Sequence, residues 1–102
     1  MSQEKGIKFD EGKRDWVLVP WDVMEEVVQV LEHGAKKYKP DNWKYVRPVS
    51  RYLNPIFRHV TAYMNGEKND PDTGKSHLAS VICNCLFAMW HEKHPEPDPE
   101  VV

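Results

Sequence analysis

The sequence has no long apolar segment and little net charge. Its 102 residues include 14 basic and 16 acidic side chains, which leaves a formal net charge of −2. Such a balance provides no overall basic field to attract nucleic acid or an anionic membrane. No apolar run approaches the roughly 18 residues that a membrane span needs, and the N-terminal residues show no signal-peptide pattern. We therefore expect a cytoplasmic protein without a membrane or nucleic-acid partner.

Cysteine is also scarce. Cys83 and Cys85 are the two cysteines, and they are too close in sequence to form a disulfide framework. Both lie in an apolar run, where cysteine usually behaves as a small core residue. The sequence likewise lacks an internal repeat, a P-loop, a Rossmann-type glycine pattern and the spacing of a zinc knuckle. A function must therefore be argued from less familiar combinations of residues.

Apolar residues recur at helical spacing in three segments and predict an all-α fold. The segments cover about residues 22–38, 50–65 and 76–91. The third segment is apolar around most of its circumference, which implies burial on two sides. We expect a compact helical bundle of about three main helices. Because so short a chain buries a modest fraction of its surface, we also expect a homo-oligomer.

Several residues mark where these helices start or are interrupted. Asp22 and Glu25, three residues apart, are arranged as a capping box for the first helix. Gly34 interrupts that helix at a cost of about 1 kcal/mol relative to alanine, which favours either close helix packing or room for a ligand. Pro55 has two interpretations, since the second helix either begins there with Asn54 as its cap or is kinked.

The two ends of the chain are polar. Residues 1–19 form an extended arm in which Gly12 permits a turn that sets Lys8 and Lys13 near each other, either to meet phosphate or as solvated surface lysines. Three residues can anchor the arm: Phe9, Trp16 and Leu18. Residues 95–102 alternate proline with acid, a pattern typical of a flexible, disordered tail.

A loop of acidic and turn-forming residues separates the second helix from the third. Residues 66–77 hold three carboxylates, and Glu67 and Asp70 point the same way if the first turn is helical. Carboxylates at this density suit Mg²⁺, Mn²⁺ or Ca²⁺, although an exposed turn has a similar composition. In the first helix Glu26 has no capping role, and we expect it to be a further metal ligand.

Other polar and aromatic residues are candidates for contact with a ligand. Arg58 suits bidentate phosphate binding, while its neighbour His59 is either functional or a satisfied structural histidine. Trp43 either stacks on a base or anchors its loop to the core. A polar line through the apolar third helix should face a site or a water-filled seam; it consists of His77, Ser80 and Asn84.

Taken together, short motifs occur in a distinctive order. They are Lys8-Phe9-Asp10-x-Gly12-Lys13, Leu18-Val19-Pro20, Gly34-Ala35-x-Lys37-Tyr38, Asn42-Trp43, Arg58-His59, Gly66-Glu67-x-x-Asp70, Gly74 and His77-Leu78-Ala79. This ordered set, within about residues 6–90, resembles the phage-type dATP/dGTP diphosphohydrolases, which look like compact relatives of the MazG-like all-α nucleotide pyrophosphohydrolases. The chain departs from the better-known enzymes, which carry an ExxE pair on one helix and an ExxD pair on another. Here Glu26 is followed by Gln29, and the pair Glu67 and Asp70 lies in a loop.

The resemblance implies a fold, a reaction and a domain organisation. Residues 1–94 would form a single MazG-like nucleotide pyrophosphohydrolase domain, followed by the tail at 95–102. The domain would assemble into oligomers and hydrolyse a purine deoxynucleoside triphosphate to the monophosphate and pyrophosphate. The cofactor would be Mg²⁺, with Mn²⁺ as the alternative. The location would be the cytoplasm, of an infected bacterial host if the chain is phage-encoded.

Roles for individual residues follow from the residue chemistry and the resemblance together. Glu26, Glu67 and Asp70 would hold the metal and, with His77, form the catalytic group. Substrate would be bound by Lys13, Lys37, Trp43, Arg58, His59 and Asn84. Two alternatives remain open: a non-catalytic phage protein that sequesters a nucleotide or cyclic-nucleotide signal, and a metal-stabilised interaction module. The number of carboxylates favours the enzyme, because binding an anion does not require three acids.

Overall fold

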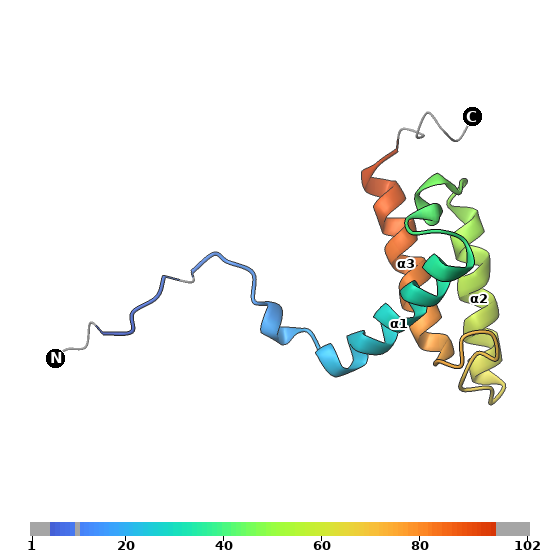
Figure 1. Cartoon of the computed structure of the whole chain (residues 1–102), viewed down its shortest axis with the longest axis horizontal. Helices are drawn as coiled ribbons and strands as arrows, with labels where there is room; N and C mark the ends of the chain where they lie inside the picture. Colours follow the sequence, from blue (N-terminus) through green and yellow to red (C-terminus); the bar gives the residue numbers. More distant parts are fainter. Residues whose placement is uncertain (1–4, 10, 96–102) are drawn as a thin grey trace.

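Three α-helices and two short 3₁₀ helices make up the fold. The computed structural model describes residues 5–9 and 11–95, and these residues form helices and loops but no strand. The α-helices are α1 (Trp21–Lys37), α2 (Ser50–Met64) and α3 (His77–Lys93) (Figure 1). The 3₁₀ helices are η1 (Trp16–Leu18), before α1, and η2 (Asn42–Tyr45), before α2. The all-α fold predicted from the sequence is confirmed.

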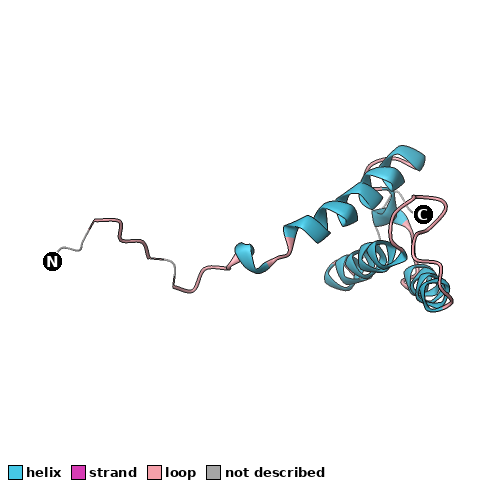
Figure 2. Cartoon of the chain, turned by 90° about the horizontal axis from the view of Figure 1, so that it is seen from below, coloured by secondary structure: helices cyan, strands magenta, loops and turns pink. Residues whose placement is uncertain are grey.

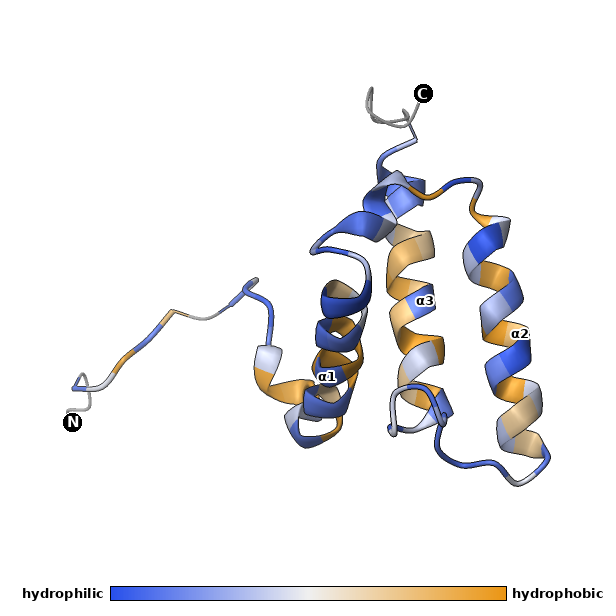
Figure 3. Ribbon diagram, turned by 45° about the vertical axis from the view of Figure 1, so that its right-hand side comes forward, coloured by the Kyte–Doolittle hydropathy of each residue, from blue (hydrophilic) through white to orange (hydrophobic). Residues whose placement is uncertain are grey.

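The third helix lies between the other two, as its apolar circumference predicted. It packs against both α1 and α2, and Figure 3 shows it as the most apolar of the three. The core is centred on Val27 of α1 with Ala79 and Cys83 of α3. The thiol of Cys83 donates to the carbonyl oxygen of Val27 at 3.5 Å, so the two helix backbones approach closely there.

The connection between α1 and α2 is held by a second, aromatic cluster. The ring of Trp43 stacks on Phe87 with centroids 4.6 Å apart. The hydroxyl of Tyr52 hydrogen-bonds the carbonyl oxygens of Trp43 and Val46, the latter at 2.8 Å. Nε2 of His91 donates to the same Trp43 oxygen at 3.0 Å. Backbone groups of this loop are thus satisfied by side chains from α2 and α3, as buried polar groups require.

The start of α1 differs from the predicted capping box. The helix begins at Trp21 with Pro20 at the N-cap position, and Asp22 makes no capping hydrogen bond. The carbonyl oxygen of Pro20 accepts the N–H groups of Val23 and Met24 at 3.0 Å, because the fixed φ of proline already directs the chain into the helix. Asp22 lies in the first turn, where a negative charge is favourable.

The second helix begins before its proline. It starts at Ser50 and includes Pro55 as an interior residue, so the alternative in which Asn54 caps a helix starting at Pro55 is wrong. The loss of one backbone hydrogen bond at Pro55 falls near the N-terminal end. Packing against α3 compensates for it, since α2 and α3 form the most extensive helix–helix interface of the chain.

The described part of the N-terminal arm leaves the bundle and packs against no helix of the described residues. Figures 1 and 2 show it extending away from the helices, and the radius of gyration is 18.3 Å against about 13 Å for a compact chain of this length. The predicted anchors Phe9, Trp16 and Leu18 are 83%, 67% and 80% exposed. The prediction that they anchor the arm is therefore wrong for the single chain, because the described residues leave all three largely exposed.

Two further expectations concern the whole chain. No helix among the described residues is long and apolar enough to span a membrane. The expected tail, apart from Pro95, lies outside the described residues.

Candidate functional site

The loop between α2 and α3 is folded onto itself. Gly66, with φ +99°, turns the chain out of α2 in a region that glycine adopts without a steric penalty. The N–H of Asp70 donates to the carbonyl oxygen of Lys75 at 2.7 Å, and the N–H of His77 donates to that of Lys68 at 3.0 Å. These hydrogen bonds fix Asp70 relative to the first turn of α3.

The folded loop brings one carboxylate against two histidines. His59 comes from α2, Asp70 from the loop, and His77 is the first residue of α3. Nδ1 of His59 lies 2.8 Å from Nδ1 of His77 and 3.9 Å from Oδ2 of Asp70. The three potential ligand atoms lie within 4.8 Å of one another. His77 is buried, whereas the other two are half-buried, so the cluster sits at the edge of the bundle.

The hydrogen bond to Glu67 fixes the orientation and the tautomer of His77. Nε2 of His77 donates to Oε1 of Glu67 at 2.7 Å. Because a carboxylate oxygen only accepts, the ring hydrogen of His77 resides on Nε2. The lone pair of Nδ1 is then directed at His59 and the centre of the cluster.

The surroundings of His59 favour its neutral form. Burial lowers the pKa of His59 below its usual value, and the neighbouring His77 and Arg58 act in the same direction. Asp70 opposes them, but burial is the largest of these effects. A neutral imidazole retains a lone pair, which a metal ligand or a proton acceptor needs.

The structure does not bring the three predicted metal-binding carboxylates together. Oε2 of Glu26 accepts the N–H of Ser76, immediately before α3, at 2.6 Å, and Glu67 is engaged by His77. Among the described residues, the side chains identified as converging on a possible metal position are those of His59, Asp70 and His77. Glu26 therefore acts as a hydrogen-bond acceptor at the start of a helix, where a carboxylate is favourable.

Next to this cluster is a cavity of about 940 Å³ whose wall comes from α1, η2, α2, the loop and α3. His59 and Asp70 belong to both the cluster and the cavity wall. Ser80 and Asn84 also line the cavity, so two of the three residues of the predicted polar line face it. Gly34 lines it too, and a methyl group at Gly34 would meet no atom within 4 Å. Of the two interpretations of Gly34, the structure therefore favours room for a ligand over close helix packing.

Two of the three predicted phosphate-binding cations line the cavity. They are Lys37 and Arg58. Nζ of Lys37 lies 3.5 Å from Oδ2 of Asp72, whose charge raises the pKa of the lysine. Lys13 lies on the exposed arm and does not line the cavity. A single chain thus assembles Lys37 and Arg58 near the cluster, but not Lys13.

The predicted base-stacking residue is engaged in packing. Trp43 lies face to face with Phe87 and edge to face with Trp90, and Nζ of Lys44 is 5.6 Å from the centroid of the Trp43 ring. Trp43 contributes to the cavity wall as well. Of the two roles considered from the sequence, anchoring the loop to the core accounts for these contacts.

Among the residues of the cavity wall that the sequence did not predict as functional are two that contact each other, His33 and Asp72. Nε2 of His33 lies 3.4 Å from Oδ2 of Asp72, and both residues line the cavity. Asp72 belongs to the acidic loop but lacks the three-residue spacing that singled out Glu67 and Asp70. His33 follows Glu26 and Gln29 along one flank of α1, a signal that helical spacing alone contained.

Comparison with known proteins agrees with the resemblance found in the sequence. The family model described as "dATP/dGTP diphosphohydrolase, N-terminal" matches residues 3–100. A protein of Salmonella phage PMBT28, named dATP/dGTP diphosphohydrolase, is 35% identical over 85 residues. These residues make up 83% of this chain and 29% of the phage protein, so the chain spans less than a third of that relative's length. No solved structure matches the chain. On the match to nearly its whole length, the chain belongs to the family of N-terminal domains of dATP/dGTP diphosphohydrolases.

Proposed function

We propose that this chain binds a purine deoxynucleoside triphosphate in the cavity and hydrolyses it to the monophosphate and pyrophosphate, with a divalent cation. The observation that carries the proposal is that His59 and Asp70 belong both to a possible metal site and to the cavity wall. The name of the phage relative supports the substrate class and the reaction. The phage origin of that relative supports action in the cytoplasm of an infected bacterium.

The cavity has the size and the polarity for a nucleotide. Ligand pockets usually occupy about 300–1,000 Å³, and the cavity of about 940 Å³ reaches the upper part of this range. Arg58 and Lys37 would neutralise phosphate oxygens. Ser80 and Asn84 would contact the sugar or the base, with the amide of Asn84 oriented by its hydrogen bond to the carbonyl oxygen of Ser80 at 2.8 Å.

In the proposed reaction a water oxygen forms a bond to the α-phosphorus, and the bond from that phosphorus to its bridging oxygen breaks. Pyrophosphate leaves, and the water proton passes to solvent or to the leaving group. A divalent cation held at Asp70 and its neighbours would withdraw charge from the phosphates and acidify the attacking water. The sequence predicted Mg²⁺ with Mn²⁺ as the alternative, and either ion also accompanies a triphosphate in solution. Glu67 would act indirectly, by holding the ring of His77 in position.

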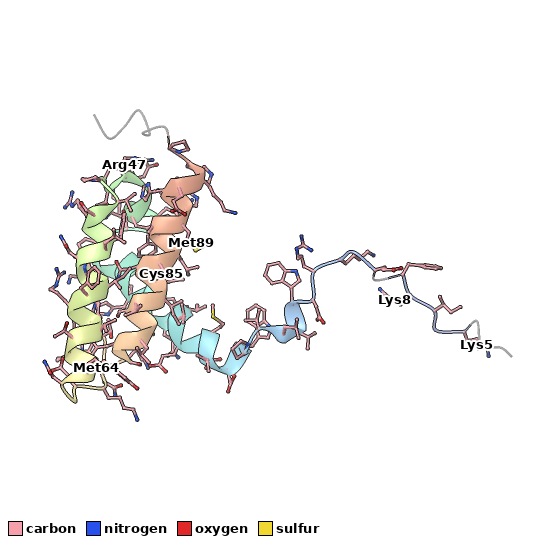
Figure 4. All side chains as sticks on the ribbon, turned by 180° about the vertical axis from the view of Figure 1, so that it is seen from behind. Lys5, Lys8, Arg47, Met64, Cys85 and Met89 are labelled. Atoms are coloured by element: carbon pink, nitrogen blue, oxygen red, sulfur yellow. The ribbon has the colours of Figure 1, made fainter. Side chains whose placement is uncertain are left out.

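The same proposal includes a homo-oligomer. Four residues spaced by four, three and four positions form one exposed apolar stripe on α2: Leu53, Phe57, Val60 and Met64. On α3, Met89 is 53% exposed and Cys85 is exposed as well, and Figure 4 shows both, together with Met64, from behind. Exposed apolar side chains that gather on one helix face mark a protein–protein interaction surface. A second copy of the chain would cover it by packing stripe against stripe.

One observation favours the alternative in which the protein sequesters a nucleotide without cleaving it. The count of three metal-binding carboxylates was the argument for catalysis, and two of them, Glu26 and Glu67, are engaged elsewhere. The cavity itself fits either function.

The test is hydrolysis by the chain alone. The purified protein is incubated with a panel of deoxynucleoside and ribonucleoside triphosphates plus Mg²⁺ or Mn²⁺, and the monophosphate, the diphosphate and the intact nucleotide are resolved. We expect monophosphate and pyrophosphate from a purine deoxynucleotide, and a loss of at least about a hundredfold in kcat/KM for Asp70→Asn. Glu92→Gln, an exposed carboxylate on α3 outside the cavity, is the matched control. Tight nucleotide binding without turnover would establish sequestration instead.

A further inference from the structure

The cluster of His59, Asp70 and His77 has the composition of a site for a transition metal. We propose that it binds one first-row transition ion, of the class of Mn²⁺, Fe²⁺, Co²⁺ or Zn²⁺, through the two Nδ1 atoms and a carboxylate oxygen of Asp70. The inference deepens the proposed function, because it names the resident ion of the same site. It does not depend on turnover, since metal binding is measured without nucleotide.

The ligand types favour such an ion over Mg²⁺. Imidazole nitrogen suits Mn²⁺, Fe²⁺, Co²⁺ and Zn²⁺, whereas Mg²⁺ prefers oxygen ligands and keeps several of its waters. Two histidines and one carboxylate leave coordination positions open for water and substrate. The sequence suggested Mg²⁺ because it counted three carboxylates, but tertiary contacts place two imidazoles beside one of them.

The distances between the ligand atoms fit one central ion. Bonds of about 2.0–2.2 Å put neighbouring ligands roughly 3.0–3.5 Å apart. Nδ1 of His59 lies 2.8 Å from Nδ1 of His77 and 3.9 Å from Oδ2 of Asp70. All three ligand atoms lie within 4.8 Å of one another, so a movement of the Asp70 side chain toward the two imidazoles would complete the site. Oδ1 of Asp70 meanwhile accepts the N–H of Asp72 at 3.0 Å, which leaves Oδ2 directed at the cluster.

The hydrogen bond to Glu67 supplies the second independent sign of a metal ligand. Histidines that bind metals usually donate their other ring N–H to a carboxylate or a carbonyl oxygen, which fixes the tautomer and raises the basicity of the ligand. His77 makes this contact with Glu67 at 2.7 Å. Without a metal, one ring hydrogen must lie between the two Nδ1 atoms. For His59 to bind a metal through Nδ1, its ring hydrogen would have to move to Nε2.

The charges at the site also balance a divalent ion. The N-terminal end of α3 bears a positive partial charge, which disfavours a nearby cation. Asp70 and Glu67 together contribute two negative charges, so a divalent ion would leave these groups neutral in total. Without an ion, the same residues could form a proton relay from Glu67 through His77 to His59, and the experiment distinguishes the two arrangements.

The experiment measures metal binding to the full chain in the absence of nucleotide. Protein treated with a chelator is titrated with Co²⁺, Mn²⁺, Zn²⁺ and Mg²⁺, followed by calorimetry and, for Co²⁺, by visible absorption. All variants carry Cys85→Ser, because this exposed thiol could itself bind Co²⁺ or Zn²⁺. We expect one equivalent of the transition ion, bound at least about tenfold more tightly than Mg²⁺.

Substitutions then assign the ligands. His59→Gln and Asp70→Asn should abolish the Co²⁺ absorption, and Glu67→Gln should weaken binding by about 10–100-fold. His94→Gln, an exposed histidine at the end of α3, is the matched control and should bind as the parent does. Circular dichroism checks that each variant is folded. His77 itself is left unchanged, because substitution of a buried residue endangers folding.

Other outcomes overturn the inference. Absence of one-equivalent binding in the folded parent, or binding that survives both His59→Gln and Asp70→Asn, would refute the site and leave the proton relay. Turnover with Mg²⁺ in a parent protein that binds no transition ion would refute the metal site while supporting the proposed function. Tight metal binding without turnover of any nucleotide would support the site and refute only the proposed hydrolysis.

Discussion

At the scale of single residues, Cys83 and Cys85 differ in exposure, although only one residue separates them. Cys83 is buried against Val27, and burial raises the pKa of its thiol to about 11. Cys85 is exposed. Because the thiolate is the reactive form, we expect iodoacetamide at pH 8 to modify Cys85 and spare Cys83, as read by mass spectrometry. Urea-unfolded protein should react at both, and equal rates in the folded protein would contradict the assigned burial.

Two ionisable groups with raised pKa values also predict how the stability of the protein changes at high pH. The pKa of Cys83 is raised from 9.0 to about 11, and burial raises that of Tyr52 from 10.0 to about 12. Both groups ionise more readily in the unfolded chain, so the stability they confer is complete below about pH 9 and is lost as pH rises toward 12. We expect the Tm to fall over this range, and Cys83→Ala to reduce the steepness of the fall. A Tm that increases as the pH is raised above 9 would contradict this prediction.

Glu26 provides a test between a structural and a metal-binding role. Its carboxylate accepts the N–H of Ser76 at 2.6 Å, so Glu26→Ala should lower the free energy of unfolding by about 1–2 kcal/mol. Affinity for the metal should stay unchanged in the folded variant. Urea unfolding and calorimetry measure the two effects, and a loss of metal affinity at full stability would restore Glu26 as a ligand.

At the scale of elements, a substitution at Gly34 in α1 should change the stability of the protein and its affinity for nucleotide in opposite directions. A methyl group there meets no atom within 4 Å, so Gly34→Ala should raise the free energy of unfolding by about 0.5–1 kcal/mol. The same methyl group would enter the cavity that Gly34 lines. We therefore expect weaker nucleotide binding in a more stable protein. A calorimetric titration with nucleotide measures the affinity. Unchanged affinity for nucleotide would show that the nucleotide does not lie against α1.

At the scale of the whole molecule, the exposed apolar stripe of α2 predicts assembly. Phe57 and Met64 are 69% and 77% exposed in the single chain. If a second copy covers them, Phe57→Glu should shift the mass measured by light scattering toward the monomer while the helical content is preserved. Arg51→Gln, an exposed substitution elsewhere on α2 that changes the net charge by the same amount, is the control. A wild-type chain that is monomeric at micromolar concentration would refute the assembly.

The sequence by itself determined the helices and the polar face of α3. Apolar spacing predicted the positions of α1, α2 and α3, because local periodicity decides which segments form amphipathic helices. The same spacing set Ser80 and Asn84 apart from their apolar neighbours, and both line the cavity. Pro55 was harder to interpret, since the effect of a proline depends on which backbone groups its neighbours satisfy.

Only the tertiary structure decided which side chains meet at the site. Glu26 and Ser76 are 50 residues apart in sequence, and their hydrogen bond exists because α1 crosses the start of α3. His59 and His77 are 18 residues apart and meet because the intervening loop folds onto itself. The type of a residue shows what it can bind, but the partner depends on distances in space that local spacing does not contain. For this reason the sequence identified the acidic loop, whereas only the fold placed His59 and His77 beside Asp70.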